Sequence, residues 1–253
     1  MARPVVAGNW KMNTTPEEAQ DLARGLKRGI EPFVGVERIL CPPFVSLGIV
    51  AREVAGSGIK VGAQNVHQAA SGAFTGEISV SMLRLSCSYV IVGHSERRQF
   101  SGETDAIVAA KVAAAITGGL RPIVCVGESL QVREAGRAEA HIAAQLKASL
   151  EKVPPPESLV IGYEPVWAIG TGMAATPDLA QSAAAAIRST LLSIYGQDAA
   201  HRIPIVYGGS VNAGNIAGFV EQRDVDGALV GGASLKVDDF TRIVEAVSRA
   251  KAK

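Results

Sequence analysis

Eight short runs rich in β-branched and other apolar residues recur along the chain, and longer alanine-rich segments separate most of them. Apolar runs of this length between turn residues are typical of buried strands. The longer segments have apolar residues at helical spacing, and in the first of them Ala19, Leu22, Ala23, Leu26 and Ile30 share one face. The predicted strands cover residues 5–7, 38–40, 59–61, 89–92, 123–126, 159–161, 205–207 and 227–230.

Strands and helices alternate along the chain, and this order predicts parallel strands joined by crossover helices. Thr15 precedes Pro16-Glu17-Glu18, which gives the first helix an N-cap, an initial proline and a capping-box glutamate. Thr176 opens a later helix in a similar way. Eight strand–helix units in 253 residues match a closed (β/α)8 barrel, with an open doubly wound sheet as the alternative. No linker divides the chain, so we expect residues 1–253 to form a single domain.

Composition and charge indicate a globular protein and exclude several functions. Hydrophobic residues make up 47% of the chain and charged residues 19%, which is too apolar for a disordered protein. A net charge of +1 provides no basic surface for nucleic acid or anionic membranes, and no apolar run approaches the roughly 20 residues of a transmembrane helix. Cys41, Cys87 and Cys125 lack metal-type spacing and favour a reducing compartment. We therefore expect a cytoplasmic protein without nucleic-acid or membrane partners.

The residues that follow the strands matter most, because the active site of such a barrel lies at the carboxyl ends of its strands. Glu164 follows the sixth strand, and Pro165 ends that strand. The apolar, glycine-ended turn behind it suggests a base beneath a closing lid, and burial of such a carboxylate raises its pKa. A solvated loop with one charge is the alternative. The predicted lid comprises Pro165, Val166, Trp167, Ala168, Ile169, Gly170, Thr171, Gly172, Met173, Ala174 and Ala175.

Two further strand ends carry a cation and an imidazole. Lys11 follows the first strand beside Trp10, with Asn9 as a neutral donor and acceptor; an ordinary surface lysine is the alternative. His94 is the one histidine among four that lies at the carboxyl end of a predicted strand, with one residue between them. We expect a helix to begin near Ser95, whose N-terminus disfavours the imidazolium, so that His94 donates a hydrogen bond as a neutral ring. Supporting or surface ion-pair roles are expected for Glu96, Arg97 and Arg98.

Glycine pairs follow the last two strands. Gly208-Gly209-Ser210 comes after the seventh strand, and Gly231-Gly232 comes after the eighth. Backbone N–H groups at these two positions form the usual phosphate site of a (β/α)8 barrel, so we expect a phosphorylated ligand. A Cys125 nucleophile would need an adjacent base, which the sequence does not identify. No histidine pair has metal-ligand spacing, so no metal site is expected.

The third strand is followed by a long irregular segment, residues 64–79, with the apolar tip Gly72-Ala73-Phe74-Thr75-Gly76. Loops of this length are usually functional or interfacial. An apolar tip favours contact with a protein partner.

A carboxylate, an imidazole, an ammonium group and a phosphate site together suit proton abstraction next to a carbonyl. Return of the proton to the neighbouring carbon would complete an aldose–ketose shift. A lid would protect the enediol phosphate, which can lose its phosphate in water. No nucleotide fingerprint accompanies these groups, so no cofactor is expected.

Six segments, in order and covering essentially the whole chain, resemble the triosephosphate isomerase family. They are Gly8-Asn9-Trp10-Lys11-Met12-Asn13, Gly93-His94-Ser95-Glu96-Arg97-Arg98, Tyr163-Glu164-Pro165-Val166-Trp167, Ala168-Ile169-Gly170-Thr171-Gly172, Tyr207-Gly208-Gly209-Ser210 and Val230-Gly231-Gly232-Ala233-Ser234. The resemblance implies interconversion of dihydroxyacetone phosphate and D-glyceraldehyde 3-phosphate, in glycolysis and gluconeogenesis, without a cofactor. This family is the standard example of a glutamate base paired with a neutral histidine beneath a closing loop.

By motif position, the resemblance makes Glu164 the base, His94 the electrophile, and Lys11 with Asn9 the substrate-binding pair. Ser95 and Glu96 would support them. The phosphate would be held by backbone groups of Gly170, Ser210, Gly231 and Gly232.

The resemblance also implies a homodimer, or in some members a tetramer. The 64–79 loop, with Thr75 near its tip, would reach into the neighbouring subunit beside the lysine. The chain departs from the family pattern at the far hinge of the lid. It has Met173-Ala174-Ala175 where many members have a polar triplet such as Lys-Thr-Ala. Small residues still suit a hinge, so we expect activity to be retained. The alternatives are another phosphosugar enzyme on this barrel and an inactive barrel that serves as a binding partner.

Overall fold

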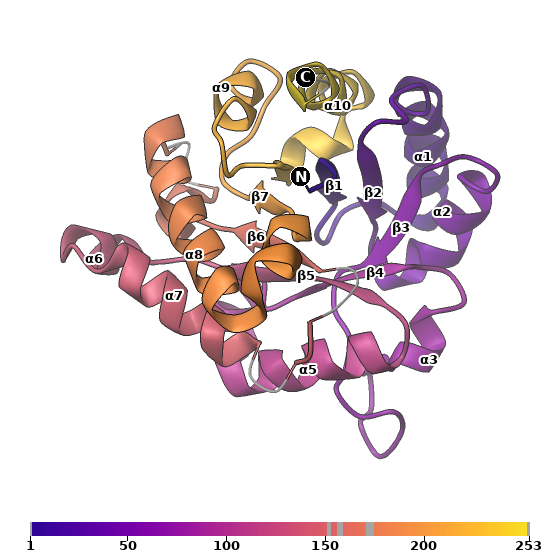
Figure 1. The fold of residues 1–253 in the computed structure, drawn as a ribbon. Coiled ribbons are helices and arrows are strands. Elements are labelled where there is room, and N and C mark those ends of the chain that lie inside the picture. The colour runs from indigo at the N-terminus through magenta and orange to yellow at the C-terminus, as the bar shows by residue number, and fades with distance from the viewer. Residues whose placement is uncertain (1, 151–152, 156–158, 171–174, 252–253) are drawn as a thin grey trace.

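The computed structural model describes residues 2–150, 153–155, 159–170 and 175–251. Eight parallel strands pair in chain order, and the last pairs with the first to close a barrel. Figure 1 shows the strands at the centre with helices around them. They are β1 (Val5–Asn9), β2 (Glu37–Cys41), β3 (Lys60–Ala63), β4 (Tyr89–Val92), β5 (Arg121–Val126), β6 (Val160–Tyr163), β7 (Ile205–Tyr207) and β8 (Gly227–Val230). All eight predicted strands are confirmed, and the barrel is closed rather than open.

The helices cover the outside of the barrel. The predicted starts of two of them are confirmed: Thr15 forms both hydrogen bonds of a capping box with Glu18, and Thr176 accepts the N–H of Leu179. In the part of the chain that the structure describes, no helix has the length and apolar character needed to cross a membrane. The helices are α1 (Pro16–Ile30), α2 (Leu47–Glu53), α3 (Val80–Leu83), α4 (Ser95–Phe100), α5 (Asp105–Thr117), α6 (Leu130–Glu134), α7 (Ala138–Ser149), α8 (Pro177–Arg202), α9 (Ile216–Val220) and α10 (Val237–Lys251), with the 3-10 turns η1 (Phe44–Ser46), η2 (Val166–Ala168) and η3 (Gly232–Leu235).

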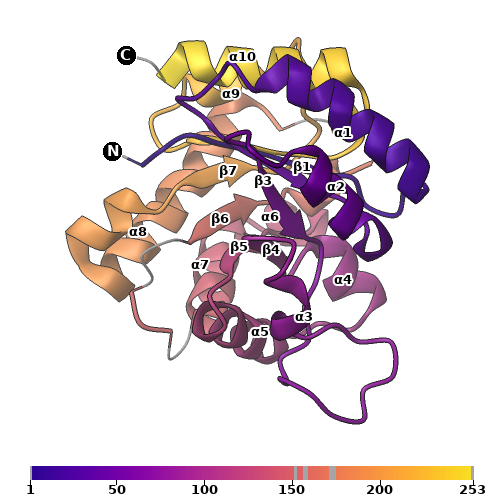
Figure 2. The ribbon, with the colours of Figure 1, turned by 90° about the vertical axis from the view of Figure 1, so that its right-hand side faces the viewer.

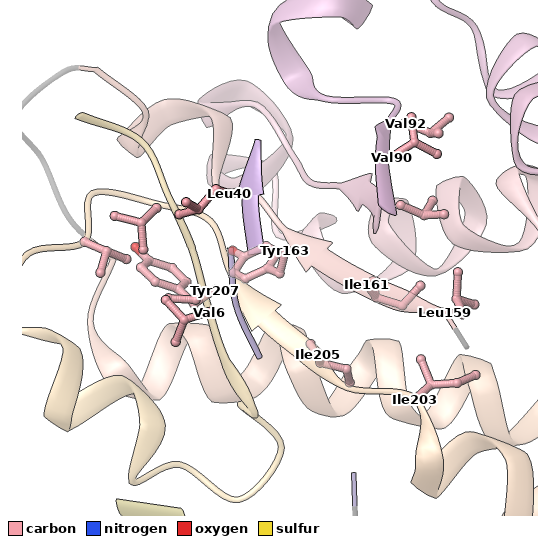
Figure 3. Packing of buried hydrophobic residues seen from close by; sticks show 14 of the residues in the cluster. Val6, Leu40, Val90, Val92, Leu159, Ile161, Tyr163, Ile203, Ile205 and Tyr207 are labelled. Atoms are coloured by element: carbon pink, nitrogen blue, oxygen red, sulfur yellow. The ribbon is translucent and has the colours of Figure 1, made fainter. Parts of the chain in front are cut away.

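Alternate strand residues contribute to two apolar layers. The larger layer packs between strands and helices and includes Tyr163 and Tyr207, whose ring centroids lie 6.2 Å apart (Figure 3). Successive strand residues face opposite sides, so Asn9 continues the inward face of β1 and Glu164 continues that of β6. Both side chains therefore belong to the carboxyl end of the barrel interior. The smaller layer fills that interior with Val5, Ala7, Ile39, Cys41, Tyr89, Ile91, Ile123, Cys125, Val160, Val206 and Leu229.

The segment between β3 and α3 projects away from the barrel in both ribbon views (Figures 1 and 2). Near its tip, Phe74 is 48% exposed and packs on His67, with ring centroids 4.2 Å apart. Its base is tied to the barrel, because the side-chain amide of Gln64 donates to the carbonyl oxygens of Lys11 (2.8 Å) and Cys41 (2.9 Å). The loop thus presents an apolar tip on a fixed base.

Candidate active site

Glu164 lies at the carboxyl end of β6 and is 2% exposed. Its Oε2 accepts the backbone N–H of Ser95, at 2.8 Å, where α4 begins. Its Oε1 lies 2.9 Å from Nε2 of His94, yet it receives no well-directed hydrogen bond from any described residue. A buried carboxylate oxygen in this situation is available to accept a proton.

Opposing effects set the charges of this pair. Burial raises the pKa of Glu164, but His94 and the N–H of Ser95 together outweigh burial, and the net pKa lies below the ordinary value of glutamate. The expectation from burial alone was therefore wrong in direction. Burial likewise lowers the pKa of His94, whereas the carboxylates of Glu164 and Glu96 raise it, and the net pKa lies above the ordinary value of histidine. Among the groups that raise the pKa of the imidazole, the carboxylate of Glu164 has the largest effect.

The orientation of His94 follows from its place as the N-cap of α4. The N–H of Glu96 donates to Nδ1 of the ring at 3.2 Å. Because the nitrogen that accepts carries no proton, a neutral His94 has its proton on Nε2, the atom nearest Glu164. The expected helix start at Ser95 is confirmed.

Replacing Glu164 by Gln is expected to lower the pKa of His94, because it removes the main influence that raises it and leaves the burial that lowers it. The imidazolium of the variant should therefore lose its proton at a lower pH than in the unaltered protein. An NMR titration that follows the imidazole nitrogens measures this directly. An unchanged or higher pKa in the variant would show that the carboxylate does not control the ring.

Lys11 has a left-handed backbone with φ of 53°, which is uncommon for a residue other than glycine. Three contacts hold it in place. Oδ1 of Asn9 accepts its N–H at 3.0 Å, the amide of Gln64 donates to its carbonyl at 2.8 Å, and its Nζ lies 2.5 Å from Oε1 of Glu96. Strained residues persist where their surroundings over-determine them, and they cluster at functional sites. The ion pair of Glu96 was expected, whereas the contribution of Gln64 was not.

A cavity of about 270 Å³ opens at this end of the barrel. It brings together every residue predicted to bind substrate, from segments far apart in the chain. Glu164 does not line it, because its carboxylate lies against Ser95. The lining consists of Asn9, Lys11, His94, Ile169, Gly170, Gly208, Gly209, Ser210, Val211, Leu229, Gly231 and Gly232.

The near end of the predicted lid is attached to the end of β5 through Glu128, a fully buried residue. Its Oε1 accepts hydrogen bonds from Trp167 Nε1 (2.8 Å), Arg133 Nε (2.7 Å) and the hydroxyl of Tyr163 (3.2 Å). Its carbonyl accepts the N–H of Val166 at 3.1 Å. Sequence reasoning left this strand end unassigned, and the only signal there was a charged residue directly after a strand and a glycine.

The lid is attached to the end of β7 as well. The hydroxyl of Ser210 donates to the carbonyl of Ala168 at 2.7 Å, and the N–H of Ala175 donates to the hydroxyl of Tyr207 at 3.3 Å. Gly170 has φ of 71°, a left-handed conformation that suits glycine. The other predicted lid residues, Thr171, Gly172, Met173 and Ala174, lie outside the described residues, and so does most of the unusual hinge.

The neighbouring charged and nucleophilic residues have other surroundings. Arg97 pairs with Glu103 and Arg98 with Asp105, and the Arg98 side chain is only 16% exposed, which fits the supporting role expected for it rather than the surface one. Burial raises the pKa of the Cys125 thiol well above its ordinary value, as expected for a packed side chain. Within the described ranges, no group of three or more His, Cys, Asp and Glu side chains is arranged to hold a metal ion.

The closed barrel of eight parallel strands, with this cavity at the carboxyl ends of the strands, places the chain in the (β/α)8-barrel class. Residues 4–247 match the family model described as triosephosphate isomerase. The chain belongs to the triosephosphate isomerase family.

Relatives that are named triosephosphate isomerase match nearly the whole chain. The protein of Chloroflexus aurantiacus is 53% identical over 247 residues, covering 96% of this chain and 99% of the relative. The protein of Roseiflexus sp. is 51% identical, and the alignment covers 96% of this chain and 97% of the relative. The protein of Rhodopirellula baltica is 49% identical, and the alignment covers 98% of this chain and 99% of the relative. Each alignment covers at least 96% of both proteins, so the family assignment applies to the whole barrel.

Proposed function

We propose that this protein interconverts dihydroxyacetone phosphate and D-glyceraldehyde 3-phosphate, as an enzyme of glycolysis and gluconeogenesis. The observation that carries the proposal is the Glu164–His94 pair. A buried carboxylate oxygen that lacks a hydrogen bond from the described residues lies 2.9 Å from an imidazole nitrogen, at the edge of a glycine-lined cavity. Family membership and the names of the relatives support the same reaction.

In the proposed mechanism, Glu164 removes a proton from C1 of dihydroxyacetone phosphate. The electrons of the C–H bond form the C1–C2 double bond of an enediolate, and the carbonyl π electrons move to the C2 oxygen. The Nε2–H of His94 and the ammonium group of Lys11 stabilise that oxygen. Return of the proton to C2, with proton exchange between the two oxygens, gives the aldehyde. Glu164 must first turn from Ser95 toward the cavity, because Ser95 now holds its Oε2.

The phosphate would lie among the glycines after β7 and β8, with Gly170 of the lid above it. Glycine stands at positions 208, 209, 231 and 232, so no side chain covers the backbone there. Backbone N–H groups then approach the anion closely, and Lys11 adds a full positive charge. The lid excludes water from the enediolate, which otherwise loses phosphate.

The purified protein is expected to isomerise triose phosphates and to leave longer sugar phosphates unchanged, because its relatives are named triosephosphate isomerase. A coupled assay with each triose phosphate tests the first part, and a panel of four- to six-carbon aldose phosphates tests the second. Activity confined to a longer sugar phosphate would favour another phosphosugar isomerase. Binding without turnover of any of them would favour the inactive barrel.

We also propose that residues 1–253 act as one domain and assemble as a homodimer in the cytoplasm. The pairing of β8 with β1 joins the two ends of the chain in one sheet, which supports a single domain. Met12 and Phe100 are 96% and 76% exposed around a second cavity of about 490 Å³ beside the active site. The hollow combines apolar residues such as Met12, Phe44 and Phe100 with the charged residues Lys11, Glu96 and Arg97, and this mixed lining suits the tip of the 64–79 loop of a second copy.

Replacing Thr75 by Arg is expected to convert the dimer into monomers. Thr75 is exposed near the loop tip, and a long charged side chain there would be too large for the hollow and would lose hydration on entering it. Sedimentation velocity at several concentrations gives the mass. Gln197→Arg, an exposed position in α8, is the matched control and should leave the mass unchanged. A dimeric Thr75→Arg protein would place the interface elsewhere.

A further inference from the structure

Arg98 makes an unusually extensive set of contacts for a residue beside the active site. Its Nε donates to the carbonyl of Gly93 at 2.7 Å, and its Nη1 pairs with Oδ1 of Asp105 at 2.6 Å. Its Nη2 donates to the carbonyl of Cys125 at 3.2 Å and to Oγ of Ser149 at 3.4 Å. One planar cation therefore binds groups from four parts of the fold.

Two of these acceptors lie at the strand ends that frame the site. The carbonyl of Gly93 belongs to the residue between β4 and His94, and that of Cys125 lies near the carboxyl end of β5. The guanidinium fork is rigid and its five donors have fixed directions, so it fixes the distance between the two carbonyls. A lysine in its place has one ammonium group and cannot hold both in the same geometry.

The Gly93 turn decides where His94 lies. Gly93 has φ of 71°, and a Cβ there would come within 3.0 Å of Nη2 of Arg98 and 2.9 Å of Val108, so the turn and the guanidinium fit against each other. α4 begins directly after His94, and its first N–H groups hold Oε2 of Glu164 and Nδ1 of His94. A helix of six residues is too short to be stable on its own, so its start depends on tertiary contacts.

We propose that Arg98 is a positioning residue of the isomerase, which fixes the Gly93–His94 turn and the start of α4 and thereby aims His94 at the substrate oxygen. This inference rests on the proposed function. Arg98 does not line the active-site cavity, so it acts through His94 and not on the substrate. Its contacts with Gly93 and Asp105 tie that turn to α5.

The test is the kinetics of Arg98→Ala with and without guanidinium ion at a sub-denaturing concentration. We expect kcat to fall by roughly 10- to 100-fold, because a displacement of about 1 Å costs about that much, while KM changes by less than about threefold. Guanidinium should restore kcat by at least about fivefold by occupying the vacated site, and methylammonium should not, since it lacks the planar fork. Arg98→Lys keeps a positive charge at this position and is the second variant, in case Arg98→Ala does not fold. Its kcat should lie between those of the unaltered protein and Arg98→Ala, and guanidinium should not raise it.

The matched control is Arg38→Ala. Arg38 is also a buried guanidinium that donates to two backbone carbonyls, those of Ile30 and Glu31, but it lies at the amino end of β2. The Arg38→Ala variant should be less stable than the unaltered protein but should have the same kcat. Equal kcat losses in the two variants, or unchanged kcat in both Arg98→Ala and Arg98→Lys, would overturn the inference.

A second readout needs no turnover. The imidazole nitrogen signals of His94 should shift and broaden in Arg98→Ala and return with guanidinium, and they should stay unchanged in Arg38→Ala. Unchanged signals in Arg98→Ala would also overturn the positioning role. An unaltered protein that is inactive on triose phosphates contradicts the proposed function itself, whereas an active protein that is indifferent to Arg98 contradicts only this inference.

Discussion

Replacing Glu164 by Gln is expected to lower kcat by roughly 10³- to 10⁴-fold, the upper range of what a positioned base contributes. Glutamine has the shape of glutamate and fits the same buried space, so it removes the proton acceptor with little change in packing. KM should change little, because glutamine keeps the shape of glutamate and the residues proposed to bind the phosphate are unaltered. A coupled assay gives both constants, and loss of exchange of the substrate C1 hydrogens in D2O shows which step has failed.

The comparison for this variant is Glu221→Gln, which neutralises an exposed carboxylate just after α9 and should leave turnover unchanged. Circular dichroism and thermal unfolding should show both proteins folded. If Glu164→Gln keeps more than about a tenth of the unaltered kcat, a loss far below the range for a catalytic base, another group removes the proton.

Replacing Gly127 by Ala is expected to have the second largest effect, on activity and stability together. A Cβ there would lie 1.7 Å from the carbonyl oxygen of Glu164 and 2.6 Å from its carbonyl carbon. This contact is between backbones at the ends of β5 and β6, where the N–H of Glu164 donates to the carbonyl of Val126 at 2.8 Å. The two chains must separate, and a shift of about 1 Å in the base lowers kcat by about 100-fold. The overpacking should also cost roughly 1–3 kcal/mol of unfolding free energy, or more.

Gly227→Ala separates these two effects. Its Cβ would lie 1.8 Å from the carbonyl oxygen of Val5, an equally severe contact, but at the amino ends of β8 and β1. Urea unfolding should show both variants destabilised, and only Gly127→Ala should lose kcat when the rate is expressed per folded molecule. Normal kcat in folded Gly127→Ala would mean that the base tolerates displacement of its backbone.

The barrel could be predicted from the sequence because its signals are local. Each strand is a short apolar run, and Thr15 and Thr176 mark helix starts by their own side chains. Parallel strands in a barrel then place their carboxyl ends together, so Lys11, His94 and Ser210 could be expected at one cavity without knowledge of any distance.

The contacts that hold those groups could not be predicted, because they join residues far apart in the chain. Gln64 reaches the carbonyl of Lys11 across 53 positions, and Trp167 reaches Glu128 across 39. The pKa of Glu164 was expected in the wrong direction for the same reason. Its burial follows from the sequence pattern, whereas its partners, His94 and the N–H of Ser95, follow only from the fold.

Gln64 gives the proposed dimer a kinetic consequence. It is the first residue of the loop that would enter the second subunit, and its amide fixes the strained backbone of Lys11. In the proposed dimer the partner would hold the loop tip, so we expect loss of the partner to loosen the loop and, through it, the hold of Gln64 on Lys11. Specific activity should therefore fall on dilution through the range in which the subunits dissociate, and it should recover with added protein. Catalysis by one subunit would then depend on its association with a second.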